Sequence, residues 1–214
     1  MTKKEEWLAG TRSAVPIMLG YVPVGIAYGV MARQAGLNTW QTVLMSLTVY
    51  GGASEMMAAG MVAQGAAVLT IVLTTFILNL RHIIMSTCVF NQMQGGRLPV
   101  RMLAAFGVTD ETFAVYTTTA NAPRTPRYFF SMALCSYLSW ALGSWLGAIA
   151  TGLLPPLITA ALGISLYAMF IGLLMPGLHG NGRLAALVVL TALCNTVLCN
   201  VVQLDSGWSM ILST

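Results

Sequence analysis

Long apolar runs follow one another at short intervals along nearly the whole chain. A helix needs about 20 apolar residues to cross the hydrocarbon core of a bilayer. The pattern therefore predicts membrane helices over residues 13–32, 40–63, 66–90, 102–120, 128–152, 156–176 and 184–204. A further apolar stretch begins near Trp208, and we expect it to be too short to cross. The expected fold is all-α: a polytopic transmembrane helix bundle of about seven spans, forming a single membrane domain over residues 1–214.

Several of these spans contain residues that interrupt a helix. Residues 13–32 include two prolines, residues 40–63 carry Gly51-Gly52 near their middle, and residues 102–120 hold Gly107, Thr109 and two acids at their centre. Broken backbone is tolerated at membrane depth only where protein or a water-lined cavity satisfies the freed polar groups. Discontinuous helices of this kind build binding sites in transporters, so we expect some spans to be broken or re-entrant.

Two of the interrupted segments resemble each other. Residues 50–58 (YGGASEMMA) and residues 106–114 (FGVTDETFA) share an aromatic residue, Gly, Glu and Ala at matching places. Transporter halves often descend from internal repeats. Similarity also arises by chance in sequence rich in Gly and Ala, so the repeat stays a hypothesis at this stage.

The composition supports a membrane protein and excludes several other classes. The chain is 57% hydrophobic and 7% charged, whereas soluble domains carry roughly 25% charged residues. The net charge of +4 comes from Lys and Arg residues standing singly or in pairs, which indicates cytoplasmic loops and no nucleic-acid surface. No GxSxG, HExxH, Walker or GxGxxG motif is present, and two histidines are too few for a multi-histidine metal centre. We therefore expect neither an enzyme nor a cofactor.

The basic residues give a first estimate of orientation. If the N-terminus is cytoplasmic and all seven spans cross, the cytoplasmic side holds Lys3, Lys4, Arg12, Arg124, Arg127 and Arg183. The opposite side then holds Arg33, Arg97 and Arg101. The positive-inside rule favours this orientation, but the loop with Arg97 and Arg101 is awkward. A re-entrant segment between residues 40 and 120 would change the count.

The third span carries a charge inside the membrane. An Arg at the centre of a membrane helix costs about 2.5–3.5 kcal/mol, so a chain that keeps Arg81 usually uses it. Helical spacing places Thr75, Asn79, His82 and Ser86 on one polar stripe and Arg81 about 100° away. Arg81 either binds a substrate carboxylate or pairs with an acid of the second or fourth span. His82 lies on a proton path or is a hydrogen-bonded core histidine.

Three acids occupy the broken spans. Glu55 follows the double glycine and either binds a substrate ammonium or a proton, or pairs with Arg81 to fix packing. Asp110 and Glu111 are adjacent, so on a helix they point about 100° apart. Thr109 is placed to cap a half-helix whose first turn holds both acids, an arrangement that the helix dipole favours. That capping role and a role in binding substrate or a proton remain equal alternatives.

Small residues mark where helices approach closely. Gly25 and Gly29 form a GxxxG pair in the first span, and Gly143 and Gly147 form another in the fifth. Such pairs pack membrane helices. Trp140 lies deep in the fifth span, away from the interface where Trp usually sits. Packing is its expected role, with the lining of a cavity as the alternative.

Four stretches carry a resemblance to the AzlC family, the large subunit of bacterial branched-chain amino acid exporters. They are PVGIAYG at residues 23–29, GASE at 52–55, NLRH at 79–82 and GVTDETFA at 107–114, and the similarity extends over nearly the whole chain. The resemblance implies proton-driven export of branched-chain amino acids across the bacterial cytoplasmic membrane, together with a small membrane subunit of the AzlD type. The chain departs from the family's G-A-S-Q pattern at Glu55, which puts substrate preference and ion coupling in doubt.

The leading hypothesis is a secondary transporter for small apolar amino acids, and Arg81→Ala is expected to abolish export without preventing insertion. Candidate substrate-binding residues are Gly51, Gly52, Ser54, Glu55, Asn79, Arg81, Thr109, Asp110 and Phe113. Candidate proton-coupling residues are Glu55, His82, Asp110 and Glu111. The alternative is a structural or assembly subunit whose buried charges only hold a partner, and a membrane-embedded enzyme is weaker still. The sequence leaves open whether the chain forms a homo-oligomer.

Overall fold

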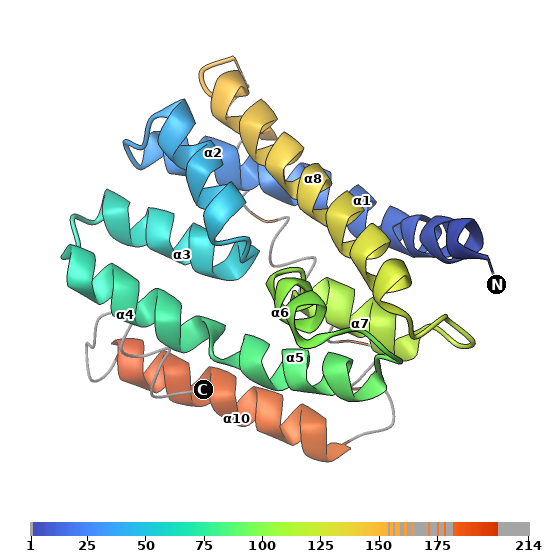
Figure 1. Cartoon of the computed structure of the whole chain (residues 1–214). Helices are drawn as coiled ribbons and strands as arrows, with labels where there is room; N and C mark the ends of the chain where they lie inside the picture. Colours follow the sequence, from blue (N-terminus) through green and yellow to red (C-terminus); the bar gives the residue numbers. More distant parts are fainter. Residues whose placement is uncertain are drawn as a thin grey trace.

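In the part of the chain that the structure describes, three helices are long and apolar enough to cross a membrane. They are α1 (Lys3–Gln34), the combined α4 (Val68–Asn79) and α5 (Arg81–Gln92), and α8 (Pro126–Ala150). The computed structural model describes residues 2–153 and 182–200 and isolated positions between 155 and 178, and this part of the chain holds helices and no strand (Figure 1). The predicted span at 156–176 and the stretch near Trp208 lie outside the described residues, apart from isolated positions. α10 (Gly182–Asn200) corresponds to the predicted span at 184–204.

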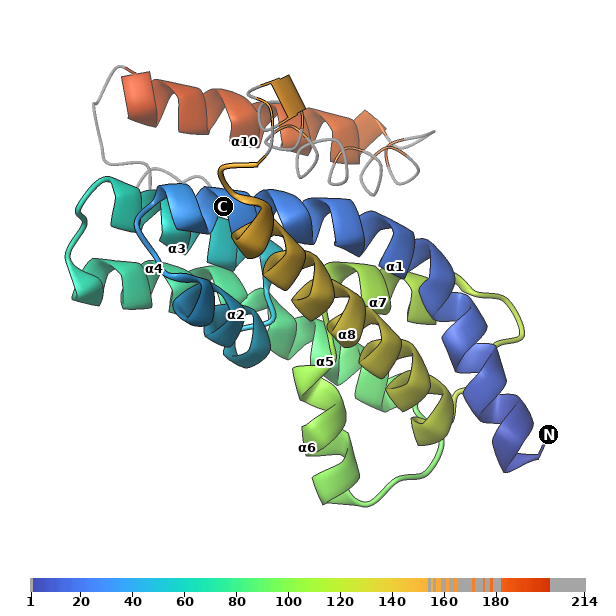
Figure 2. The same cartoon turned by 90° about the horizontal axis from the view of Figure 1, so that it is seen from above.

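α1 and α8 form the framework on which the other helices are mounted (Figure 2). A Cβ at Gly25 would lie 3.2 Å from the Cα of Gly143, and one at Gly147 would strike the carbonyl of Ile26. Both predicted GxxxG pairs therefore face each other, because only glycine lets these two backbones approach so closely. α1 stays one helix through both of its prolines.

α2 (Thr39–Thr48) and α3 (Gly52–Ala63) form a hairpin that enters the bundle and returns to the same end. α2 starts five residues after α1 ends, and the Tyr28 hydroxyl of α1 donates to the carbonyl of Thr42 near that start. Further along α2, the hydroxyl of Ser46 bonds to that of Ser144 and the carbonyl of Leu47 accepts from Tyr137, so α2 runs along α8. α3 then runs back toward the end at which α2 began and packs against α4. A four-residue loop connects α3 to α4. At 1.5 Å per residue each arm spans about 15–18 Å, half of a hydrocarbon core about 30 Å thick.

α6 (Leu98–Phe106) and α7 (Asp110–Thr118) form a second hairpin, which enters from the opposite end. The loop before α6 meets the loop before α8, where the amide of Gln94 donates to the carbonyl of Arg124 at 2.6 Å. The same end holds the N-terminus, because Arg127 lies 3.6 Å from Glu6. The spans predicted at 40–63 and 102–120 therefore bend back, which confirms the expectation that some spans are re-entrant.

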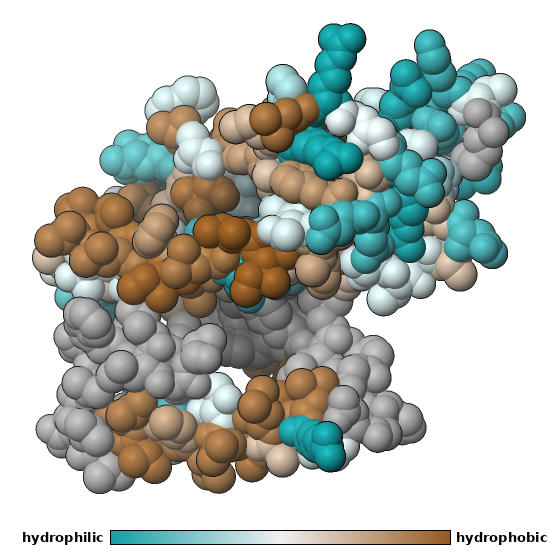
Figure 3. Space-filling model, turned by 60° about the horizontal axis from the view of Figure 1, so that its bottom comes forward, coloured by the Kyte–Doolittle hydropathy of each residue, from teal (hydrophilic) through white to brown (hydrophobic). Residues whose placement is uncertain are grey.

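This topology corrects the distribution of basic residues. Arg97 and Arg101 lie at the end that holds the N-terminus, where Figure 3 shows most of the hydrophilic side chains. That end carries Lys3, Lys4, Arg12, Arg97, Arg101, Arg124 and Arg127. The opposite end of α1 to α8 carries Arg33. With this distribution the positive-inside rule favours a cytoplasmic N-terminus, and the loop with Arg97 and Arg101 no longer opposes it.

The two segments that resemble each other hold equivalent places in the fold. Residues 50–58 and 106–114 each form the tip of a hairpin and the start of its inner arm, α3 or α7. The rings at the first positions, Tyr50 and Phe106, lie 6.0 Å apart between centroids. Hairpins that enter from opposite ends and meet at their tips have the arrangement of an inverted repeat.

Candidate functional site

The candidate site lies where the two hairpin tips meet the middle of α1 and α8 and the start of α5. Between them is a cavity of about 20 Å³, lined by polar and aromatic side chains from all five elements. A volume of this size holds about one water molecule. Its lining residues are Tyr21, Tyr50, Gly51, Gly52, Ala53, Arg81, His82, Thr109, Asp110, Glu111 and Trp140. The structure thus brings most of the predicted site residues together around one small space.

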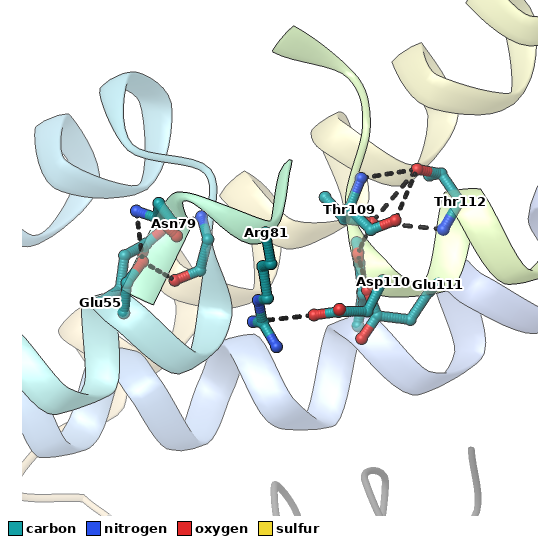
Figure 4. A network of polar contacts seen from close by, with 10 residues as sticks. Glu55, Asn79, Arg81, Thr109, Asp110, Glu111 and Thr112 are labelled. Atoms are coloured by element: carbon teal, nitrogen blue, oxygen red, sulfur yellow. Dashed lines mark hydrogen bonds and ion pairs between the residues drawn. The ribbon is translucent and has the colours of Figure 1, made fainter. Parts of the chain in front are cut away.

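Arg81 pairs with Asp110 across the cavity. Its Nη2 lies 2.9 Å from Asp110 Oδ2, and Figure 4 shows the two side chains pointing toward each other. The side chain of Arg81 is 39% exposed and that of Asp110 is 27% exposed, so the ion pair is only partly shielded from solvent. Of the partners considered from the sequence, the acid of the fourth span is the one found. The alternative pairing of Arg81 with Glu55 is wrong, because Glu55 is bonded elsewhere.

Glu55 is fully buried and takes its hydrogen bonds from neutral donors. Its carboxylate accepts from the amide of Gly51 at 2.9 Å, the hydroxyl of Ser46 at 3.0 Å and the indole of Trp140 at 3.3 Å. It also sits in the first turn of α3, where the helix dipole favours a negative charge. These contacts tie the first hairpin to α8, and the described residues place no cation within ion-pair distance of Glu55.

Glu111 occupies the matching place in the second hairpin. Its carboxylate accepts a hydrogen bond of 2.6 Å from the hydroxyl of Tyr21 on α1. The same hydroxyl lies 2.7 Å from the hydroxyl of Thr109. Each hairpin therefore presents a Glu at its tip to an aromatic donor of a crossing helix: Glu55 to Trp140 and Glu111 to Tyr21.

Thr109 caps α7, as the sequence predicts. Its hydroxyl accepts from the amide of Thr112 at 3.3 Å, and the amide of Thr109 donates to the hydroxyl of Thr112 at 2.8 Å (Figure 4). Asp110 and Glu111 occupy the first turn of the helix that begins there. The cap fixes where α7 starts, and this start aims one acid at Arg81 and the other at Tyr21.

The polar stripe predicted on the third span is interrupted between Asn79 and Arg81. Leu80 separates α4 from α5 in a tight turn, with its amide bonded to the carbonyl of Ile77 at 3.1 Å. Such turns have fewer residues per turn than an α-helix, so regular helical spacing no longer holds across Leu80. Both Arg81 and His82 consequently line the cavity, although the spacing predicts different faces.

The remaining predicted residues lie close by or outside the cavity. Asn79 donates from Nδ2 to the hydroxyl of Ser54 at 3.2 Å, and that hydroxyl donates to the carbonyl of Gly51 at 2.8 Å. Ser54 and Asp110 are matching positions of the repeat, and each binds a residue that flanks Leu80. Phe113 lies further along α7, is partly buried against the core and does not line the cavity.

Three buried polar atoms near the cavity have no hydrogen-bond partner in the described part of the chain. They are the Tyr50 hydroxyl, Asn79 Oδ1 and Arg81 Nε. Buried polar atoms are normally paired, so unpaired ones need an explanation. A hydroxyl, an acceptor and a cationic donor near one cavity suit a small ligand that carries both a cation and an anion.

The two aromatic donors are functional residues that sequence reasoning missed. Tyr21 and Trp140 bond to the two glutamates, and their ring centroids lie 5.4 Å apart. In an apolar span an aromatic residue is usually a packing residue, so packing is the expected role of Trp140 and cavity lining the alternative. The available signal was depth, because a buried Tyr or Trp still needs a partner for its polar atom.

The comparisons with known proteins agree on one family. Residues 16–154 match the family described as AzlC protein. An uncharacterized membrane protein of Archaeoglobus fulgidus is 33% identical over 87% of this chain and 82% of its own length. The inner membrane protein YgaZ of Escherichia coli is 30% identical over 79% of this chain and 72% of its own length. The branched-chain amino acid transport protein AzlC of Bacillus subtilis is 27% identical over 70% of this chain and 61% of its own length. No solved structure matches the chain.

Proposed function

The chain belongs to the AzlC family, and on that premise we propose that it is a secondary transporter for branched-chain or other small apolar amino acids. The proposed direction of transport is export across the bacterial cytoplasmic membrane, and the proposed driving force is the proton gradient. One relative, from Bacillus subtilis, is named as a branched-chain amino acid transport protein. The observation that carries the proposal is the Arg81–Asp110 pair, held at the meeting point of two opposed hairpins.

An amino acid zwitterion carries the same two charges as this pair. The substrate carboxylate takes the place of Asp110 at Arg81, and the released Asp110 accepts the substrate ammonium. Charge-assisted hydrogen bonds of this kind are roughly twice as strong as neutral ones, so the substrate offsets the loss of the ion pair. The unpaired Asn79 Oδ1 and Tyr50 hydroxyl are further acceptors for the ammonium, and Arg81 Nε is a further donor for the carboxylate.

The start of α3 supports anion binding at the same place. Gly52 and Ala53 line the cavity in the first turn of α3, where backbone amides have no acceptor within the helix. The positive end of the helix dipole adds to the attraction. Side chains at Gly52 would obstruct this approach, since a Cβ there would lie 2.9 Å from the Trp140 ring.

The small volume of the cavity corresponds to a closed state of the transport cycle. About 20 Å³ holds one water and no amino acid, so the hairpin tips have to separate before a substrate enters. The hairpins reach the site from opposite ends of the bundle. Movement of α2–α3 opens the site toward one side of the membrane, and movement of α6–α7 opens it toward the other, which is alternating access around a fixed site.

Glu111 is the proposed carrier of the coupling proton. It lines the cavity next to Asp110, and its partner, the Tyr21 hydroxyl, can both give and accept a hydrogen bond. Glu55 is less suited to this role, because three donors already occupy its oxygens. His82 and Asp110 complete the titratable lining and are secondary candidates. Glu111→Gln should retain exchange of labelled substrate and lose net transport driven by a pH gradient.

A second candidate role is that of an assembly subunit. α4–α5 carries Arg81, yet only 6% of its most apolar stretch is buried, compared with 50% in α1 and in α8. This exposed apolar face has room for lipid, for a small subunit of the AzlD type or for a second copy of the chain. The small subunit is the partner that we propose.

Counterflow in proteoliposomes separates the two functions. Vesicles that contain the purified chain, with or without the small subunit, are loaded with unlabelled leucine. Uptake of labelled valine or leucine into these vesicles is then measured. Accumulation above that of empty vesicles, abolished in Arg81→Ala, supports a transporter. A folded wild-type preparation that shows no uptake with the small subunit present would leave the assembly role as the better account.

A further inference from the structure

An apolar pocket lies directly beside the polar cavity. Its volume is about 270 Å³, and it opens between α6 and α8. The walls include Tyr50 from the first hairpin tip, Leu103 and Phe106 from α6, and Phe130, Leu134 and Tyr137 from α8. Tyr50 also lines the polar cavity, so one side chain forms the partition between the two spaces.

Tyr50 is held in an unusual conformation. Its φ angle is +47°, a left-handed value that is a genuine outlier for a bulky residue. Its ring is 3% exposed and packs edge-on to Tyr137 with centroids 4.9 Å apart. In the residues that the structure describes, its buried hydroxyl has no hydrogen-bond partner, because the nearby Tyr21 hydroxyl already donates to Glu111. A strained backbone and an unpaired hydroxyl in one residue indicate that Tyr50 is not in its most stable conformation in the closed state.

We propose that the apolar pocket receives the aliphatic side chain of the transported amino acid, and that Tyr50 is the partition this side chain displaces. The inference rests on the proposed transport function and names the part of the site that selects the substrate. With the carboxylate and ammonium between Arg81 and Asp110, the side chain has to leave the polar cavity through a wall. Tyr50 is the wall behind which empty apolar space lies.

The lining of the pocket defines the class of side chain that it accepts. Among the described residues, those that line it carry no charge, so a charged side chain would lose its hydration without gaining a partner from them. The volume of about 270 Å³ is slightly below the 300–1,000 Å³ range of drug-sized ligand sites, so the pocket has ample room for an aliphatic side chain. Glycine and alanine leave the pocket empty and gain little from it. The structure therefore assigns preference for larger aliphatic side chains to this pocket.

A lipid chain is the competing occupant. Leu103, Phe130 and Leu134 also line a larger groove that leads to Arg127 near the cytoplasmic end of α8. Substrate is favoured because the pocket reaches inward to Tyr50 and Gly107, the tips of both hairpins, where a substrate has to pass. A lipid chain would occupy the pocket without altering discrimination between amino acids.

The test fills the pocket and measures the selectivity between two substrates. Leu134→Trp adds bulk to a side chain that lines the pocket, and Leu138→Trp places the same bulk on α8 where 56% of the leucine is exposed and the pocket is not reached. Hydrophobic pockets discriminate by about 10–200-fold per methylene. The ratio of leucine to alanine counterflow should fall at least about 10-fold in Leu134→Trp and remain unchanged in Leu138→Trp.

A second variant enlarges the pocket and protects the test against simple misfolding. Phe106→Ala removes a ring from the wall and should raise phenylalanine counterflow relative to leucine, a gain that damage alone does not produce. Unchanged substrate ratios in both variants, with wild-type transport intact, would overturn the side-chain pocket and leave the proposed transport function standing. Absence of all amino acid counterflow in the wild-type protein would instead contradict the transport function itself.

Discussion

Gly29 offers the sharpest test of the α1–α8 framework. A Cβ at this position would lie 2.7 Å from the amide nitrogen of Ala148 and would also strike the carbonyl oxygen of Ser144. Both atoms belong to helix backbone, which cannot rotate out of the way as the end of a side chain can. Gly29→Ala therefore forces α1 and α8 apart.

The size of the effect follows from a matched control on the same helix. Gly20 has no atom within 4 Å of an added Cβ. Both substitutions gain about 1 kcal/mol of helix propensity, and this gain cancels when the two variants are compared. The difference left is the cost of overpacking, about 1–3 kcal/mol. For a chain of this length that corresponds to roughly 2–12 °C in Tm.

Thermal unfolding in detergent measures the difference directly. Tryptophan fluorescence of both variants is followed at one scan rate, because membrane proteins often unfold irreversibly. Gly29→Ala should melt below Gly20→Ala and transport more slowly, since the seam also sets the 5.4 Å spacing of Tyr21 and Trp140. Equal melting temperatures, or a more stable Gly29→Ala, would refute the close approach of the two helices.

Three further predictions concern the hairpins. Thr109→Ala should destabilise the protein by about 1 kcal/mol through loss of the α7 cap, with Thr109→Ser close to wild type, as measured by Tm. Trp140→Phe should cost about 1 kcal/mol, the net worth of its hydrogen bond to Glu55, and equal stability would show that bond to be absent. Single cysteines in loop 64–67, in a background without native cysteines, should react with an impermeant thiol reagent outside intact cells. Cysteines in loop 93–97 should react only after the membrane is opened, and the reverse pattern would invert the topology.

Local chemistry made the broken helices predictable from the sequence. Gly51-Gly52 and the Gly107–Thr109 segment each end one half-helix and begin another. Thr109 signals a cap because its hydroxyl can accept from a backbone amide three residues on. The facing GxxxG pairs were predictable for the same reason, since a small residue repeated every four positions marks a close approach.

The course of the hairpins and the partner of Arg81 depend on contacts between distant segments, which the sequence alone did not predict. Residues 40–63 are long and apolar enough to cross, and hydropathy does not tell a crossing helix from two arms that turn back. The basic residues at Arg97 and Arg101 pointed to a re-entrant segment, but did not say which span bends. The partner of Arg81 also depended on where the hairpin tips meet, because both Glu55 and Asp110 follow a helix break.

The double variant Arg81→Ala/Asp110→Ala decides whether a zwitterion inserts between Arg81 and Asp110. A single substitution leaves one charge without its partner, whereas the double variant removes both together. Leucine counterflow is measured in proteoliposomes alongside Tm for the single variants, the double variant and the wild type. We expect the double variant to recover the Tm of the wild type and to transport no leucine. Recovery of leucine counterflow in the double variant would contradict this expectation, because the pair would then serve only to hold the helices together.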